Sequence, residues 1–346
     1  MRVSSRWGDS QVRALRRDRK DIIVIVLWCL GIGLIVCWGS LTLRLGTRPD
    51  ALYNLAALLQ GAPLRFGEAL RGDLPFYNRI LFPSVHRVFS ESFPALSTEQ
   101  WYVYLRIASY QGAFLAFALV CGFCLQASRS AIGLATAILA IATVAGFNHP
   151  WEEPSDALDL MALALGVGAI VRRRFILCLV LSMVFATNRD SAAFLGVAWV
   201  VLLATRQDAV RRTLEGFFIF AGSYATALAI RWVMAPHAMR NFNTQSVNVR
   251  SLLEALASFD PLSWLVVLAA SFLLFLPFLD FARPRTRRFV ALGMLLVLPV
   301  LSFGLVNEIR VFLPTFALLS FAVAESLEES ASGGANPSRE GKAPPS

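Results

Sequence analysis

The sequence predicts an all-α, polytopic integral membrane protein with about ten transmembrane helices and interfacial amphipathic helices in its first outer loop. Of the 346 residues, 56% are hydrophobic, and the mean hydropathy is +0.59. The apolar residues come in blocks of roughly twenty, the length that spans a bilayer. The net charge is +9, and the cations are almost all Arg. The Arg clusters sit in short loops, where they set membrane topology. Binding of nucleic acid has no support beyond this charge.

The chain divides into a basic cytoplasmic segment at 1–20, a single transmembrane domain at 21–325 and a polar, disordered cytoplasmic tail at 326–346. The first apolar block is too long for the core of a signal peptide and lacks a small-x-small cleavage site, so we expect a retained signal anchor. An amphipathic outer region covers 44–100. The predicted spans lie at about 21–41, 101–126, 130–147, 156–171, 175–187, 191–205, 214–235, 262–282, 289–306 and 311–325.

The basic loops agree with one topology. With the N-terminus inside, counting spans places Arg129 and the loops 172–174, 206–212 and 283–288 on the same inner side, as the positive-inside rule requires. Both termini are then cytoplasmic in a multi-pass protein of the cell membrane. The outer side receives the segments that mix acids with Asn, His, Trp and Pro, at 44–100, 149–156, 187–190, 236–261 and 307–310.

One outer stretch, HPWEEPSDALD at 149–159, concentrates four acids between two apolar blocks. If it is helical from Pro154, Asp156 and Asp159 lie on one side, with Glu152 or Glu153 one turn above. Asp156 could simply cap the span, but a cap needs one carboxylate. Asp159 falls about one turn inside the span, where a charge costs about 2.5–3.5 kcal/mol. Such a residue normally has a partner or a function.

The first outer region carries two further features. Asp50 stands directly before an apolar helical run, where it is either an N-cap or a catalytic acid, and one role does not exclude the other. The segment FYNRILFPSVHRVF at 76–89 predicts an interfacial helix with an apolar side toward lipid and a basic side toward water or phosphate.

Two short outer loops pair an Arg with an acid. TNRD holds Arg189 and Asp190, and NEIR holds Glu308 and Arg310. The arginines either form structural ion pairs with the acids of 149–159 or bind a phosphate bidentately. The five cysteines lie inside apolar blocks, and we interpret them as packing residues.

This pattern resembles the GT-C superfamily of membrane glycosyltransferases. The matching features are Asp50 at the start of the first outer region, the run Tyr77-x-Arg79-x-Leu81-x-Pro83, and the acids Glu152, Glu153 and Asp156 in the second outer loop. The family's acidic pair in the first loop is a single Asp here. The resemblance implies transfer of a sugar, with inversion, from a polyprenyl-phosphate donor to an acceptor on the outer face.

The resemblance also implies roles for individual residues. Asp50 is the expected general base, and Glu152, Glu153 and Asp156 orient the acceptor or hold a divalent metal such as Mg²⁺ or Mn²⁺. The expected substrate-binding residues are Tyr77, Arg79, Asp159, Arg189, Asp190, Glu308 and Arg310, with the arginines on the donor phosphate.

Two other classes of function remain open. Acids within spans and broken helices also mark ion-coupled transporters and flippases. The outer charges could alternatively tie helices together in a membrane assembly protein without enzymatic activity. Neither the sugar, the acceptor nor the oligomeric state follows from the sequence; the expected partners are membrane lipids and the lipid-linked donor.

Overall fold

The computed structural model describes residues 19–44, 81–145, 154–234, 269–303 and 312–332, and these residues form helices without any strand. The described part of the chain therefore confirms the all-α class. Among the predicted site residues, seven lie outside the described residues: Asp50, Tyr77, Arg79, Glu152, Glu153, Glu308 and Arg310.

The helix boundaries stay close to the predicted spans. At the basic loops, α10 begins within the loop 206–212 and α13 begins at the proline of the loop 283–288, a residue suited to the first helical position. The predicted span 262–282 differs more, because its described part, from residue 269 on, is helical only at 269–273 and in the short 3₁₀ helix at 276–278. The last helix also covers residues 326–332, which the sequence assigned to the disordered tail. The α-helices are α2 (Arg19–Arg44), α4 (Leu81–Ser92), α5 (Thr98–Phe123), α6 (Arg129–Ala145), α7 (Pro154–Val171), α8 (Phe175–Ala186), α9 (Phe194–Leu203), α10 (Ala209–Met234), α13 (Pro284–Phe303) and α14 (Leu313–Ser332), and two short 3₁₀ helices are η3 (Asp190–Ala193) and η5 (Leu276–Phe278).

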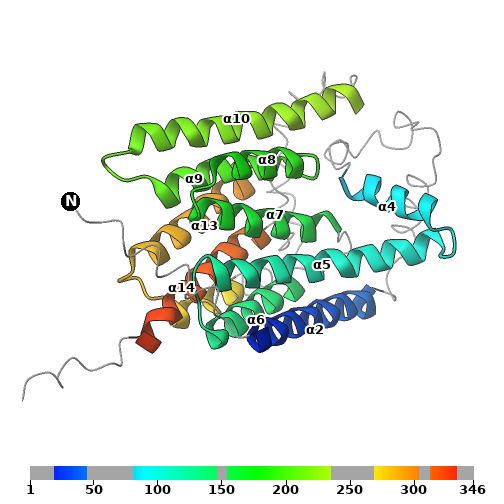
Figure 1. Ribbon diagram of the computed structural model, residues 1–346, viewed down its shortest axis with the longest axis horizontal. Coiled ribbons are helices and arrows are strands. Elements are labelled where there is room, and N and C mark those ends of the chain that lie inside the picture. Colours follow the sequence, from blue (N-terminus) through cyan, green and yellow to red (C-terminus); the bar gives the residue numbers. More distant parts are fainter. Residues whose placement is uncertain (1–18, 45–80, 146–153, 235–268, 304–311, 333–346) are drawn as a thin grey trace, which may run out of the picture.

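The helices run roughly along one direction and form a bundle with α7 at its centre (Figure 1). Helix α7 contacts α5, α8, α9 and α14, whereas α2 packs on α5 and α6, and α10 packs on α8 and α9. Two ends can be distinguished. The basic end carries residues 172–174, 204–212 and 283–288, at the left of Figure 1, and the site end carries residues 154–159 and 187–191.

Local sequence explains where α5 starts and how closely α9 and α10 pack. Ser97 and Gln100 form a capping box that starts α5, with reciprocal bonds of 3.2 and 2.8 Å between side chains and backbone. Gly196 of α9 meets Gly216 of α10 so closely that a Cβ added at Gly216 would lie 2.6 Å from the carbonyl oxygen of Gly196. Glycine at both positions therefore allows the two backbones to touch.

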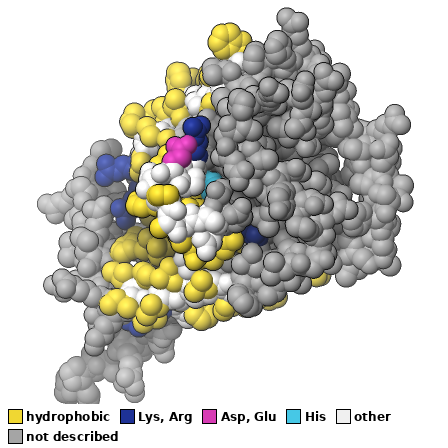
Figure 2. Space-filling view, turned by 90° about the vertical axis from the view of Figure 1, so that its right-hand side faces the viewer, with side chains coloured by type: hydrophobic (Ala, Val, Ile, Leu, Met, Phe, Trp, Pro, Cys, Tyr) yellow, Lys and Arg dark blue, Asp and Glu magenta, His cyan; other side chains and the backbone are white. Residues whose placement is uncertain are grey.

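The outward faces of several helices are strongly apolar. Val210 is 77% exposed, Ile35 71% and Trp232 68%. Soluble monomers rarely expose large contiguous apolar surface. In the view onto the site end, hydrophobic side chains of the described residues surround a few charged ones (Figure 2). The exposed apolar residues on three helices are Ile23, Val24, Leu27, Trp28, Leu34 and Ile35 on α2, Ile176, Leu177, Val180, Met183 and Val184 on α8, and Val210, Leu214, Phe217, Phe218, Phe220, Tyr224 and Trp232 on α10.

Two helical stretches in the described residues, Val103–Phe123 and Ala209–Ile230, are long and apolar enough to cross a membrane. Other described helices are apolar but shorter, among them α8 with 12 residues and α9 with 10. At 1.5 Å per residue, each of these two is about half as long as a bilayer core is thick. The number of spans therefore stays a prediction.

Candidate functional site

The first turns of α7 place two acids inside the bundle. Helix α7 starts at Pro154, and Asp156 lies in its first turn, where the helix dipole favours a negative charge. Asp159 follows three residues later and so lies on the same face. Both are buried, with 2% and 7% of their surface exposed. The predicted common face of these two acids is thus present in the fold.

The junction between α8 and α9 supplies their partners. Helix α8 ends at Ala186, and the hydroxyl of Thr187 donates to the carbonyl of Val184 across 2.6 Å. The backbone of Arg189 is then extended before η3 begins. This abrupt change of direction turns the side chains of the junction toward α7.

Three side chains of the junction contact Asp159, and one of them also pairs with Asp156. Asn188 donates to Oδ1 of Asp159 across 2.9 Å, and Ser191 donates to Oδ2 across 3.1 Å. The Nε atom of Arg189 lies 3.3 Å from Oδ2 of Asp159, while its Nη2 forms an ion pair with Asp156. Of the two roles open to Arg189, pairing with the acids of 149–159 is therefore confirmed.

Two further helices contribute to this cluster. Met161 of α7 faces Gly112 of α5, and Gly168 faces Val120, so the two helices run parallel. The same register puts the buried Arg106 at the level of the first turn of α7. Helix α4 is attached to the junction as well, because the backbone N–H of its first residue, Leu81, donates to the carbonyl of Thr187 across 3.2 Å.

The cluster is recessed in the bundle. Phe185 and Ala186 at the end of α8 pack with Ala227 of α10. Helix α10 continues from Ala227 to Met234, about 10 Å beyond this level, and α5 begins about 12 Å beyond Arg106. The charges thus lie about two helical turns below the ends of α5 and α10. Figure 1 shows that α5 extends past the start of α7.

Sequence reasoning found part of this site. It named Asp156, Asp159 and Arg189, which the fold brings together. The η3 helix contains the backbone of Asp190, whose side chain lies outside the described residues. The sequence pattern did not identify Asn188 and Ser191 as site residues, although both stand in the polar run TNRDS between two apolar blocks. Among the described residues, no three His, Cys, Asp or Glu side chains are grouped as ligands of a metal ion.

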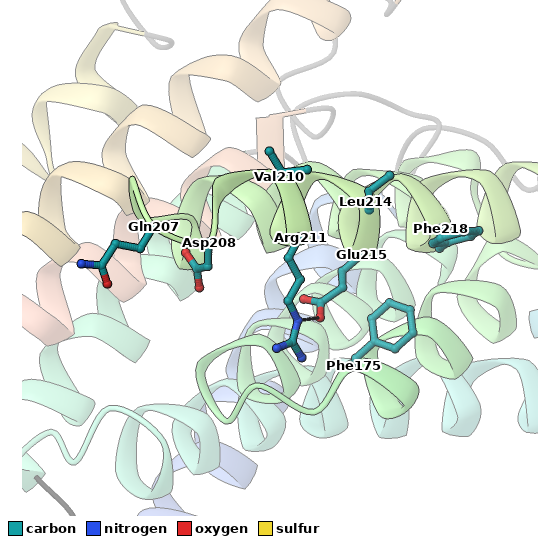
Figure 3. A pocket seen from close by; sticks show the side chains of 8 residues that line it. All are labelled: Phe175, Gln207, Asp208, Val210, Arg211, Leu214, Glu215 and Phe218. Carbon is teal, nitrogen blue, oxygen red and sulfur yellow. Dashed lines mark hydrogen bonds and ion pairs between the residues drawn. The ribbon is translucent and has the colours of Figure 1, made fainter.

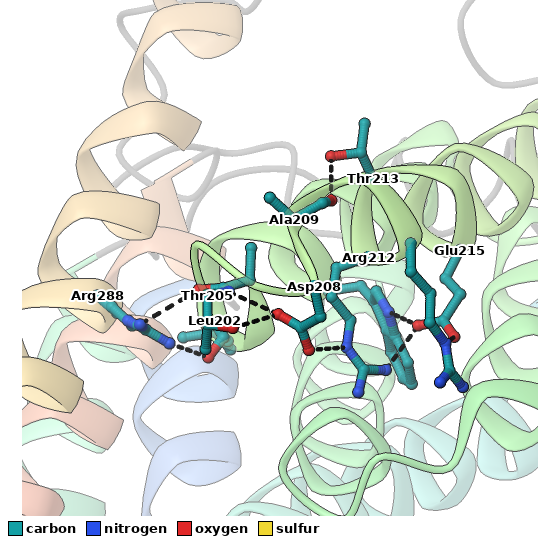
Figure 4. Close-up of polar contacts among 11 residues, drawn as sticks. Leu202, Thr205, Asp208, Ala209, Arg212, Thr213, Glu215 and Arg288 are labelled. Atoms are coloured by element: carbon teal, nitrogen blue, oxygen red, sulfur yellow. Dashed lines mark hydrogen bonds and ion pairs between the residues drawn. The ribbon is translucent and has the colours of Figure 1, made fainter.

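A second polar network, which the sequence did not indicate, holds the basic end together (Figure 4). Arg212 pairs with Asp208 at 3.1 Å and with Glu215 at 2.6 Å, and its guanidinium carbon lies 5.9 Å from the ring centre of Trp199. The indole N–H of Trp199 also donates to Glu215 across 2.9 Å. Arg288 donates to two carbonyls at the end of α9, those of Leu202 and Ala204, at 2.7 and 3.3 Å.

Asp208 begins α10 in this network. Its Oδ1 accepts the backbone N–H of Thr205 across 2.8 Å and the hydroxyl of Thr205 across 2.5 Å. These bonds, helped by the Arg212 guanidinium, lower the pKa of Asp208 from 3.8 to about 2. Arg288 thus satisfies carbonyls at the end of α9, and Arg212 helps to hold Asp208 at the start of α10.

Comparison with protein-family models, with curated proteins and with solved structures finds no match to this chain.

Proposed function

We propose that the chain is a polytopic membrane glycosyltransferase of the GT-C type, which transfers a sugar from a polyprenyl-phosphate donor at the site end. The single observation that carries the proposal is the recessed cluster of Asp156, Asp159 and Arg189. Buried acids paired with arginine at such a depth are costly and are typically functional. Because the cluster lies only about one turn inside the two apolar stretches, it would be close to the lipid–water boundary.

The apolar outward faces of α2, α8 and α10 support the membrane part of the proposal. The gathering of arginines at the basic end supports a cytoplasmic position for that end. The site end would then face the outer side, where a polyprenyl phosphate of the outer leaflet can present its sugar.

The chemistry assigns separate tasks to the proposed residues. A carboxylate, Asp50, accepts the proton of the acceptor hydroxyl as it attacks the anomeric carbon. Arginines, Arg79 and Arg310, neutralise the charge that grows on the departing phosphate. Asp159 has both oxygens engaged within the junction, so its task is to hold Arg189 and thereby Asp156 in place.

The proposal is tested with the purified chain in vesicles supplied with a panel of polyprenyl-phosphate sugars. Wild type is expected to transfer sugar, and Asp50→Asn and Glu153→Gln are expected to abolish transfer while the protein still elutes as a folded species. Asp208→Asn at the basic end is the matched control and should retain activity. Transfer at the wild-type rate in both site variants, or no transfer by wild type from any donor, would contradict the proposal.

An ion-coupled transporter is the second candidate. The observation in its favour is that α8 and α9, each too short to cross a bilayer core alone, meet at a junction whose side chains bind the buried Asp159. Vesicle uptake assays separate the two functions. A transporter should carry solute in wild type and in Asp50→Ala, whereas a transferase should carry no solute in either.

A further inference from the structure

A groove lies at the basic end, between the start of α8 and the first three turns of α10 (Figure 3). Its volume is about 670 Å³. Its lining combines polar and apolar side chains. The polar ones are Gln207, Asp208, Arg211 and Glu215, and the apolar ones are Phe175, Val210, Leu214 and Phe218.

The acids in this groove are already neutralised. Glu215 accepts bonds from Trp199, Arg211 and Arg212, and Asp208 is held by Thr205 and Arg212. These two carboxylates balance Arg211 and Arg212. The excess positive charge at this end comes from Arg206 and the exposed run 172–174, which directly precedes Phe175. The groove therefore opens into a basic surface.

Arg211 is the residue best placed to bind an anion there. Its side chain is 75% exposed, and its Nε atom donates to Glu215 across 2.9 Å. Its two terminal NH₂ groups point from α10 toward the α8 side of the groove (Figure 3). A guanidinium in this position can donate two parallel hydrogen bonds to a phosphate.

We propose that this groove binds an anionic phospholipid, with the lipid phosphate on Arg211 and an acyl chain across Leu214 and Phe218. The separation of Arg211 and Phe218 along α10 is about 10 Å, which suits a head group followed by the first part of a chain. Charge selects an anionic lipid over a zwitterionic one. This inference rests on the membrane embedding in the proposed function, and it is independent of glycosyl transfer.

The test uses the full chain purified in detergent. Phosphatidylglycerol is expected to raise the melting temperature and to remain bound in native mass spectrometry, whereas phosphatidylcholine with the same chains does neither. Arg211→Gln is expected to weaken phosphatidylglycerol binding by at least about tenfold. The fold should survive this change, because Glu215 keeps Trp199 and Arg212. Phe218→Ala should also weaken lipid binding, because it removes a contact with the acyl chain.

A matched control is present in the chain. Phe217 is as exposed as Phe218 but does not line the groove, so Phe217→Ala should have no effect.

Equal stabilisation by both lipids, or unchanged binding in Arg211→Gln, would overturn the site. An equal shift with glycerol 3-phosphate would show a free phosphate site in place of a lipid site, and this too overturns the proposal. Lipid binding in a protein that transfers no sugar would leave the site standing and contradict the transferase. Recovery of the chain as a soluble protein without detergent would contradict both.

Discussion

The side-chain amide of Asn188 donates to Oδ1 of Asp159 across 2.9 Å, and this bond joins a buried residue of the junction after α8 to a buried residue of α7. A hydrogen bond to a charged group contributes about 1.5–3 kcal/mol. We expect Asn188→Ala to lower the free energy of unfolding by that amount, measured in detergent by titration with a denaturing detergent. Thr187→Ala is the control, since it removes a bond that stays within α8, and it should cost about 1 kcal/mol or less. Equal losses in the two variants would contradict a special role for Asn188.

The ion pair between Asp156 and Arg189 should show the behaviour of a buried pair. Arg189→Gln leaves two buried acids without their shared cation, and we expect a loss of about 3–5 kcal/mol. Adding Asp156→Asn to that variant removes one stranded charge and should recover much of the loss. Arg87→Gln, which breaks an exposed pair, should cost about 1 kcal/mol at most. A double variant no more stable than Arg189→Gln would show that the two residues are not coupled.

The helical class and most helix boundaries could be predicted, because long apolar blocks interrupted by polar residues leave few alternatives. The starts of α10 and α13 could not be placed as well. Charged residues look like loop residues in a hydropathy pattern, yet Asp208 and Pro284 are good helix starters, so the helices begin inside the basic segments. The end of α14 was missed for the same reason, since its last residues are polar.

The site was predictable only through its charges. Burying an acid requires a partner, so Asp156 and Asp159 could be expected to meet an Arg from another segment. Which Arg it would be depends on how α8 ends, and Arg189 lies outside the helical pattern that a sequence reveals. Neutral partners such as Asn188 and Ser191 carry no signal of their own, because Asn and Ser are common in any turn.

The contact between Gly196 and Gly216 predicts that a larger side chain at either position lowers the stability of the protein. A methyl group at Gly196 would overlap the carbonyl oxygen of Gly216, and backbone cannot move aside as a side chain can. We expect Gly196→Ala to destabilise the protein by about 1–3 kcal/mol by forcing α9 and α10 apart. Gly133 of α6 is the control, because a Cβ there meets nothing within 4 Å, and Gly133→Ala should be neutral or slightly stabilising. The two variants are compared by their melting temperatures; similar values would contradict close packing of α9 on α10.

Asp208 predicts a dependence of stability on acid pH. Its pKa is about 2 in the folded protein against an ordinary 3.8. Because the folded-state pKa is the lower one, the stabilisation is complete above pH 3.8 and is lost as the pH falls toward 2. Asp208→Asn keeps a side-chain oxygen that can accept from Thr205 but removes the titration. The melting temperature should therefore fall less steeply between pH 4 and pH 2 in the variant than in wild type. Thr205→Val, which removes one of the two Thr205 donors, should give an intermediate slope. Identical slopes in wild type and Asp208→Asn would show that another group carries the acid sensitivity of this end.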